Sequence, residues 1–199
     1  MGFIYQFITD INFKISLASI KIVTLLLQED MINLKLYFTS LLGNLVEKLS
    51  DSKQVVRDMV MECCCSLITR SKPATFASQI IKFFQHANWH VREGVLVLLV
   101  RSILVTSVYE SRKLGSALKP NIPGSDSSSL SQICTNALLI EEICFLVKVE
   151  DKKQLQQMGI DTLALLITKS PSKVKTEGLV MKELNVTSDS SNPSQTKDN

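Results

Sequence analysis

Three contiguous cysteines and two histidines are the residues of this chain that could support metal or nucleophilic chemistry. Cys63, Cys64 and Cys65 fall in a predicted helix, where neighbouring residues point about 100° apart, so they cannot build a tetrahedral metal cage. His86 and His90 span a predicted turn, so their spacing does not place the imidazoles side by side. A free cysteine usually behaves as a small buried hydrophobe. We therefore expect no metal site and no catalytic residue here.

Other catalytic patterns are absent from the sequence as well. We find no glycine-rich phosphate loop, no Ser/His/Asp arrangement and no paired-carboxylate cleft. The sequence therefore predicts a protein that is not an enzyme and needs no cofactor.

Composition limits the classes of partner and compartment. The 199 residues suffice for one domain with a tail, and a net charge of +3 is too small to indicate nucleic acid. The five cysteines are odd in number and three are contiguous, which indicates a reduced, intracellular protein, and we expect a cytoplasmic location. The N-terminus lacks the features of a signal peptide. The apolar windows 15–27 and 95–105 are too short to span a membrane and contain Lys21 and Arg101. We expect a soluble protein that binds no membrane.

The chain is organised around the stretch from Ile80 to Ile103, which contains an apolar helix pattern, a polar turn and a second, more apolar helix pattern. The same design occurs upstream from Leu45 to Leu67. Arg57 and Arg92 hold matching places in the two copies and lie 35 residues apart. This period is typical of a solenoid of helical hairpins, so we predict an all-α, HEAT-repeat α-solenoid.

A short triplet repeats at two helix starts. Asn12, Phe13 and Lys14 form an asparagine–aromatic–base sequence, and so do Asn88, Trp89 and His90. Within the first of these helices we expect an apolar stripe with helical spacing, made of Ile15, Ala18, Ile22, Leu25 and Leu26.

The remaining pattern predicts a clipped first hairpin followed by three complete ones. We expect Asp51 to be the N-cap of a helix that reaches about Thr69, with Gln54 completing a capping box. Pro73 suits the first turn of the next helix. The further helices are expected at 89–105, 133–147, 154–168 and, after an N-cap and proline at 170–171, up to about 184.

Two segments lack a helical period. Residues 110–129 contain Gly, Pro and a serine run and predict a flexible loop inserted between hairpins. Residues 185–199 predict a disordered tail. The expected organisation is thus one domain over 1–184, with this insertion, and a tail.

The turn sequences resemble those of TOG domains of the CLASP family. The matching segments are NFK at 12–14, LVEKLSDSKQVVRD at 45–58, HANWHVREGVLVLL at 86–99 and TEGL at 176–179. The resemblance covers about 4–184 and implies a flat paddle of HEAT hairpins that binds tubulin or microtubules and stabilises or organises microtubules. It also implies a cytoskeletal location on microtubules and the spindle. The family's first hairpin and its leading aromatic contact have no counterpart here, and Gln156 stands where an arginine is expected.

In that family, the turns inside the hairpins contact tubulin. The resemblance therefore implies a set of contact residues in four turns: Phe13, Lys14, Lys53, Gln54, Asn88, Trp89, His90, Lys152 and Lys153. We expect structural roles for Asp51, Arg57 and Arg92, because an arginine in the first turn of an inner helix often bonds an acidic group of the neighbouring hairpin.

Alternatives remain for the aromatic residue, the bases and the binding face. Trp89 is either an anchor for a partner surface or a residue that packs beneath its turn. A row of bases suits an acidic protein surface, whereas single lysines occupy turns because turns are wet. The rival function is a scaffold that binds a peptide or subunit on its concave face. That function needs polar or aromatic residues at positions that here carry Met61, Val97 and Leu165.

Overall fold

The computed structural model describes residues 2–29, 33–116, 129–170 and 172–185, and every regular element in these ranges is helical. The elements in chain order are α1 (Gly2–Ile8), α2 (Phe13–Gln28), α3 (Leu34–Glu47), η1 (Lys48–Ser50), α4 (Gln54–Arg70), α5 (Pro73–Ile80), η2 (Ile81–Phe83), α6 (Trp89–Ser116), α7 (Ser129–Cys134), α8 (Ala137–Val149), α9 (Lys153–Lys169) and α10 (Lys173–Asn185). The predicted all-α class is confirmed.

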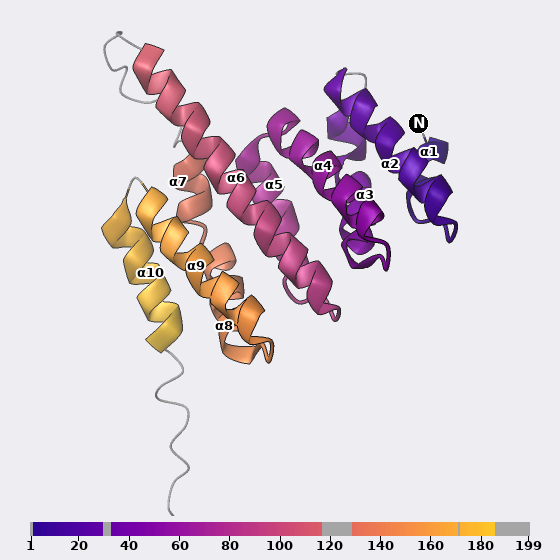
Figure 1. Ribbon diagram of the computed structural model, residues 1–199. Coiled ribbons are helices and arrows are strands. Elements are labelled where there is room, and N and C mark those ends of the chain that lie inside the picture. The colour runs from indigo at the N-terminus through magenta and orange to yellow at the C-terminus, as the bar shows by residue number, and fades with distance from the viewer. Residues whose placement is uncertain (1, 30–32, 117–128, 171, 186–199) are drawn as a thin grey trace, which may run out of the picture.

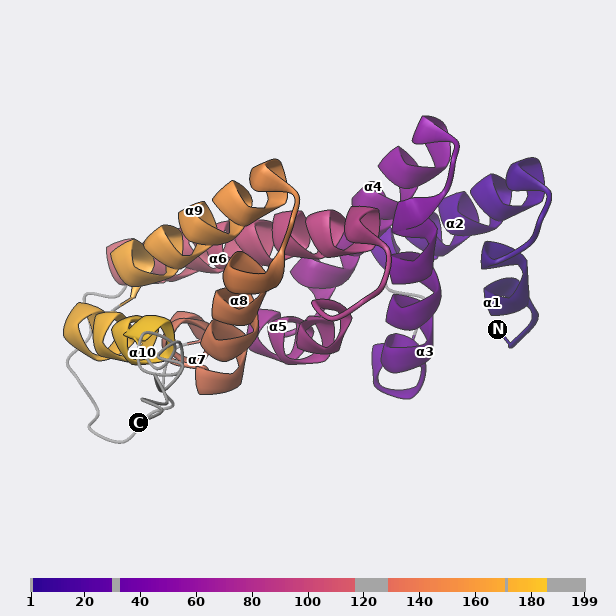
Figure 2. The ribbon, with the colours of Figure 1, turned by 90° about the horizontal axis from the view of Figure 1, so that it is seen from below.

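The helices form a row of antiparallel hairpins. α1 pairs with α2, α3 with α4, α5 with α6, and α8 with α9, while α10 packs on the last pair. The second helices α2, α4, α6 and α9 lie side by side in this order (Figure 1), and a view from below shows the first helices beneath them (Figure 2). The molecule is therefore a short solenoid with α1 and α2 at one end and α10 at the other.

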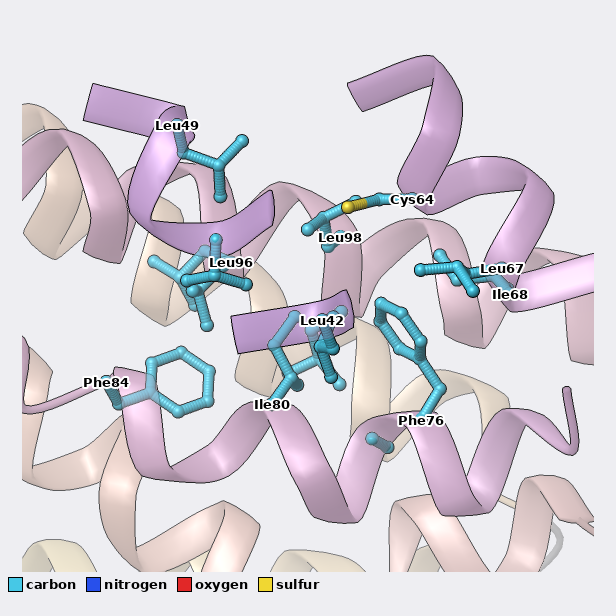
Figure 3. Close-up of a cluster of buried hydrophobic side chains, with 14 of the residues drawn as sticks. Leu42, Leu49, Cys64, Leu67, Ile68, Phe76, Ile80, Phe84, Leu96 and Leu98 are labelled. Atoms are coloured by element: carbon cyan, nitrogen blue, oxygen red, sulfur yellow. The ribbon is translucent and has the colours of Figure 1, made fainter. Parts of the chain in front are cut away.

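The core runs along the row between first and second helices. Figure 3 shows its central part, where Phe76 and Ile80 of α5 meet Leu42 of α3, Leu67 of α4 and Leu96 of α6. All five side chains are at most 1% exposed. Each hairpin thus contributes to an apolar core shared with its neighbours, which is how repeat proteins bury the apolar face of each unit.

Local chemistry explains several helix starts. The Asn12 side chain accepts a hydrogen bond from the Lys14 N–H, and the Asn136 side chain accepts one from the Leu139 N–H, so each satisfies an unpaired donor at its helix start. Pro73 is the first residue of α5, as predicted.

The prediction that Asp51 is the N-cap of α4 is wrong. Lys53 occupies the cap position, and Asp51 accepts the Lys53 N–H in the turn before the helix. The Gln54 side chain does not complete a capping box, because its amide nitrogen donates to Asp58 within α4.

Two helix boundaries also differ from the prediction. α6 does not end near Val105 but continues to Ser116, so residues 110–116 of the predicted loop are helical. Thr106 is buried and its hydroxyl donates to the Ser102 carbonyl, which lets a polar residue sit within the helix. The helix predicted at 133–147 is instead two helices, α7 and α8, because Asn136 caps the second of them.

The C-terminal region departs from the prediction at its start. α10 begins at Lys173, after a turn in which the Ser170 hydroxyl accepts the Ser172 N–H, rather than directly after an N-cap and proline at 170–171. Residues 117–128, within the predicted insertion, and 186–199, within the predicted tail, lie outside the described residues.

Of the apolar stripe expected in α2, Leu26 packs against the core but the other residues do not face it. Ile15, Ile22 and Leu25 are 42%, 47% and 52% exposed, while the opposite face of the helix is buried, with Ile20 and Val23 among its residues. A helical period identifies an apolar face but not the neighbour that covers it.

Candidate functional site: an edge of four turns

The turns ahead of α2, α4, α6 and α9 share one hydrogen-bond pattern. In each turn, a side chain accepts a hydrogen bond from the backbone N–H of the residue two positions later. That donor residue is the last one before the helix. These bonds run from Asn12 to Asp10 at 2.7 Å, from Lys53 to Asp51 at 2.9 Å, from Asn88 to His86 at 3.1 Å and from Lys152 to Glu150 at 3.2 Å. The four turns lie along one edge of the molecule, at the lower right in Figure 1, and we call this the turn edge.

A second repeated contact fixes each turn to its helix. The side chain four residues after the cap position reaches back and donates to a backbone carbonyl, either at the end of the first helix or in the turn itself. The pairs are Ser16 to Ile8 at 2.6 Å, Arg57 to Asp51 at 2.5 Å, Arg92 to His86 at 2.7 Å and Gln156 to Val147 at 2.7 Å. Gln156, which replaces the arginine expected there, thus bonds a backbone carbonyl in the same way.

Aromatic and basic residues of adjacent turns meet in pairs on the turn edge. The Lys53 ammonium lies 5.7 Å from the centre of the Phe13 ring, and the Lys152 ammonium lies 5.4 Å from the centre of the Trp89 ring. Both distances are within the range of a cation–π interaction. The same aromatic–lysine unit therefore occurs twice, once between the first two hairpins and once between the last two.

The surroundings of the two aromatic rings differ. Phe13 and Trp89 are both partly buried and pack against the core cluster. The Trp89 ring also stacks on the His90 imidazole, with ring centres 3.7 Å apart and planes inclined by 29°. Trp89 thus has one side against the protein, while Lys152 and His90 lie around its ring.

The remaining predicted contact residues divide into exposed bases and residues with internal bonds. Lys14 and Lys153 are exposed at the starts of α2 and α9. Gln54 bonds the neighbouring side chains Arg57 and Asp58, and the Asn88 side chain accepts the His90 N–H. Gln54 and Asn88 therefore shape the turn edge as well as lying on it.

Arg92 joins two hairpins. Its guanidinium donates twice to one oxygen of Glu150, at 2.9 and 2.6 Å, and also to the Ala87 carbonyl. The Glu150 side chain is only 5% exposed. Arg57 instead bonds within its own hairpin, to the Asp51 carbonyl and Gln54.

Asp51 is a charged centre of the second turn. Its carboxylate lies 3.2 Å from the Lys48 ammonium and accepts the Lys53 N–H. Burial acts to raise the pKa of Asp51, but the hydrogen bonds from Lys53 and Lys48 and the charges of Lys48 and Arg57 together lower it. Asp51 is therefore held as a carboxylate that orders the turn.

Burial disfavours the reactive thiolate form of Cys63 and Cys64. Cys63 and Cys64 are buried, and no disulfide joins any of the five cysteines. Burial raises the pKa of the Cys63 thiol to about 11 and that of Cys64 well above its ordinary value. Among the described residues, no three His, Cys, Asp or Glu side chains gather where they could hold a metal ion. No helix in the described ranges is long and apolar enough to cross a membrane.

The sequence interpretation missed three residues of the turn edge. Asp10, His86 and Glu150 accept the cap N–H in their turns, as Asp51 does in its own. Their signal was the common offset of two residues before the cap. Three different residue types fill the position, so no pattern of identical residues marks it.

Comparison with known proteins identifies the fold. No family model matches the chain, and no curated protein matches it either. One similar solved structure is described as "Crescerin uses a TOG domain array to regulate microtubules in the primary cilium". Its sequence is 20% identical to the present one. The match covers 94% of the present chain and 68% of the similar structure's chain, with a TM-score of 0.70. The chain therefore has a TOG-like fold of HEAT-type hairpins.

Proposed function

We propose that this chain is a non-catalytic, tubulin-binding module that regulates microtubules by docking its turn edge on tubulin. The observation that carries the proposal is the aromatic–lysine unit that occurs twice on this edge, as Phe13 with Lys53 and Trp89 with Lys152. The similar structure adds support, because its description names a TOG domain array and microtubule regulation. The finer proposal is a CLASP-like role in stabilising or organising microtubules in the cytoplasm and spindle.

The chemistry of the unit suits an acidic protein surface. Lysines raise the rate of encounter with a negatively charged partner, while a partly buried aromatic ring provides apolar area with little loss of side-chain entropy. Two units separated along one rigid row let the edge contact an extended partner at two places.

The alternative scaffold function has no comparable support. Met61, Val97 and Leu165, at the positions where a concave-face binder needs polar or aromatic residues, are partly buried apolar side chains. We therefore propose the turn edge alone as the binding surface.

The test compares Trp89→Ala with the substitution of an exposed apolar residue outside the turn edge. Trp89→Ala should weaken the binding of free tubulin, measured by gel filtration and fluorescence titration, by about 2 kcal/mol, or roughly 30-fold. Leu138→Ala is the control, because Leu138 is 65% exposed at the start of α8, at the other end of that helix from the turn ahead of α9. Circular dichroism checks that both variants are folded. A folded Trp89→Ala variant with unchanged affinity for tubulin and for sedimenting microtubules would contradict the proposal.

A charge reversal tests the lysines separately. The double variant Lys53→Glu, Lys152→Glu should associate with tubulin more slowly than the unmodified chain, and most so at low ionic strength. The difference in association rate should become smaller as salt is added. Lys72→Glu with Lys175→Glu makes the same change of net charge at exposed lysines outside the four turns. If both pairs slow association equally, the turn edge has no special role.

A further inference from the structure

The outward face of α2 is an apolar stripe with no cover among the described residues. Ile15, Ala18, Ile22 and Leu25 recur at intervals of three and four residues and are all exposed. Ile11 in the preceding turn is fully exposed. Such spacing is that of a helix seam that packs on another helix.

Equivalent positions in α4 and α6 face the preceding hairpin. Counted from the cap residue, Ile22 of α2 corresponds to Cys63 of α4. Cys63 is 0% exposed, and its thiol lies next to Thr24 of α2, the preceding second helix. Ile22, at the same position, is 47% exposed.

A second pair of equivalent positions also indicates that this face points toward the preceding hairpin. Leu25 of α2 corresponds to Arg101 of α6, whose guanidinium donates to the Cys65 sulfur of the preceding helix α4 at 2.9 Å. Leu25 is 52% exposed. The stripe on α2 is therefore the face by which a second helix of this solenoid stacks on the unit before it.

The opposite end of the row does not offer a matching face. α10 covers that end, with Thr176 and Val180 turned inward and Lys173, Lys175 and Lys182 exposed. Val174 and Met181 are also exposed there, but the lysines would face Lys14 and Lys21 of α2 in a head-to-tail stack. Like charges thus disfavour an open chain of copies.

The charges of α2 favour an antiparallel copy of the same helix. Its first turn carries Lys14 and no acid, and its C-cap is Glu29 with no base in the last turn. Both charges oppose the macrodipole of α2 itself. An antiparallel second α2 places Glu29 of each copy within about one helical turn of Lys14 of the other, which reduces both mismatches.

The apolar residues are self-complementary in the same arrangement. With the axis near residue 20, Ile15 lies opposite Leu25 of the second copy, and the small Ala18 lies opposite the large Ile22. Alternation of small and large side chains lets two helices approach closely. Lys21 lies close to the axis and faces Lys21 of the second copy. The repulsion between these two like charges weakens the dimer.

We propose that two copies of this chain pair through α2 across a two-fold axis, as a weak, closed dimer. A seam of one helix pair is smaller than a standard protein interface, so a dissociation constant in the micromolar range follows. The antiparallel helices point the two turn edges in opposite directions. If the proposed function holds, one dimer engages two tubulin molecules, although the pairing itself does not depend on tubulin.

Sedimentation velocity of the full chain over the micromolar range tests the dimer. Ile22→Asp should raise the dissociation constant at least about tenfold, since a buried seam position would receive a charge. Leu138→Asp is the matched control, because Leu138 is 65% exposed on α8, and it should leave the constant unchanged. A chain that stays monomeric throughout, or equal effects of the two variants, would overturn the proposal.

Charge variants separate self-pairing from the capture of another partner. Lys14→Glu should weaken the dimer, and the swap Lys14→Glu with Glu29→Lys should restore it. Lys21→Gln should strengthen it by removing the like pair at the axis. A different, acidic partner helix would bind Lys21→Gln more weakly, so a loss on this substitution would contradict a second copy as the occupant. Circular dichroism confirms that each variant keeps its helices.

Discussion

At the scale of single residues, the turn edge depends on side chains that bond the backbone as much as on those that face solvent. Arg92 shows this most clearly, because its guanidinium joins Glu150 of the next hairpin and carbonyls of its own turn. Side chains of this kind fix the positions of Trp89 and Lys152. Loss of such a residue therefore affects stability first and binding second.

Replacing Arg92 by alanine should destabilise the chain more than replacing Arg57. Arg92→Ala leaves the Glu150 carboxylate, which is 5% exposed, without its guanidinium, and we expect a loss of about 3 kcal/mol. Arg57→Ala removes bonds within one hairpin and should cost about 1 kcal/mol. Urea denaturation measures both losses. Equal losses would show that the contact between hairpins adds nothing.

The charge of Asp51 should make stability depend on pH. Its pKa is lower in the folded chain than in the unfolded chain, so its contribution is complete above the unfolded pKa of about 3.9 and is lost as the pH falls through the folded value. Asp51→Asn should therefore be less stable than the unmodified chain at neutral pH, and this gap should close in acid. Urea midpoints measured from pH 7 downwards test the sign. A gap that widens in acid would contradict the assignment.

At the scale of elements, helix packing decides which helical glycines tolerate a side chain. A Cβ at Gly159 of α9 would lie 2.6 Å from Val147 of α8, whereas a Cβ at Gly178 of α10 would meet nothing within 4 Å. At both positions glycine destabilises the helix relative to alanine. The two sites therefore differ only in packing.

Gly159→Ala and Gly178→Ala should change stability in opposite directions. We expect Gly159→Ala to destabilise the chain by roughly 1–3 kcal/mol, because α8 and α9 must separate. Gly178→Ala should stabilise it by roughly 0.5–1 kcal/mol. Thermal unfolding followed by circular dichroism distinguishes them, and stabilisation by both would mean that α8 and α9 pack more loosely than they do here.

At the scale of the whole molecule, the two ends of the row are unlike. α10 closes one end with a largely polar outer surface, as solenoids require, while α2 leaves apolar side chains exposed at the other. The row therefore has a capped end and an end suited to pairing.

The capping role of α10 is open to a direct test. Val180 is 4% exposed and lies on the inner face of α10. Val180→Asp should cost roughly 3 kcal/mol and expose the apolar surface of α8 and α9, seen as increased binding of a hydrophobic dye. Met181→Asp, at a neighbouring residue that is 51% exposed, is the control. Similar dye binding by both variants would argue against a cap.

The sequence alone was sufficient for the fold class, the hairpin period and the starts of α2 and α6, but not for the cap of α4. These features depend on local chemistry. They follow from apolar periodicity, from the cap residue Asn12, from the position of Pro73 in the first turn of its helix, and from polar turns. The sequence also pointed to Phe13, Lys53, Trp89 and Lys152 one by one, although their role in binding stays a prediction.

Only the tertiary structure decided which of these residues meet and which apolar face is covered. The pairing of Phe13 with Lys53 and of Trp89 with Lys152 joins residues of different hairpins, so it depends on how the hairpins stack. The stripe from Ile15 to Leu25 has the period of a buried face, yet it is exposed because no described helix packs on it. Periodicity is a property of one helix, whereas burial depends on its neighbours.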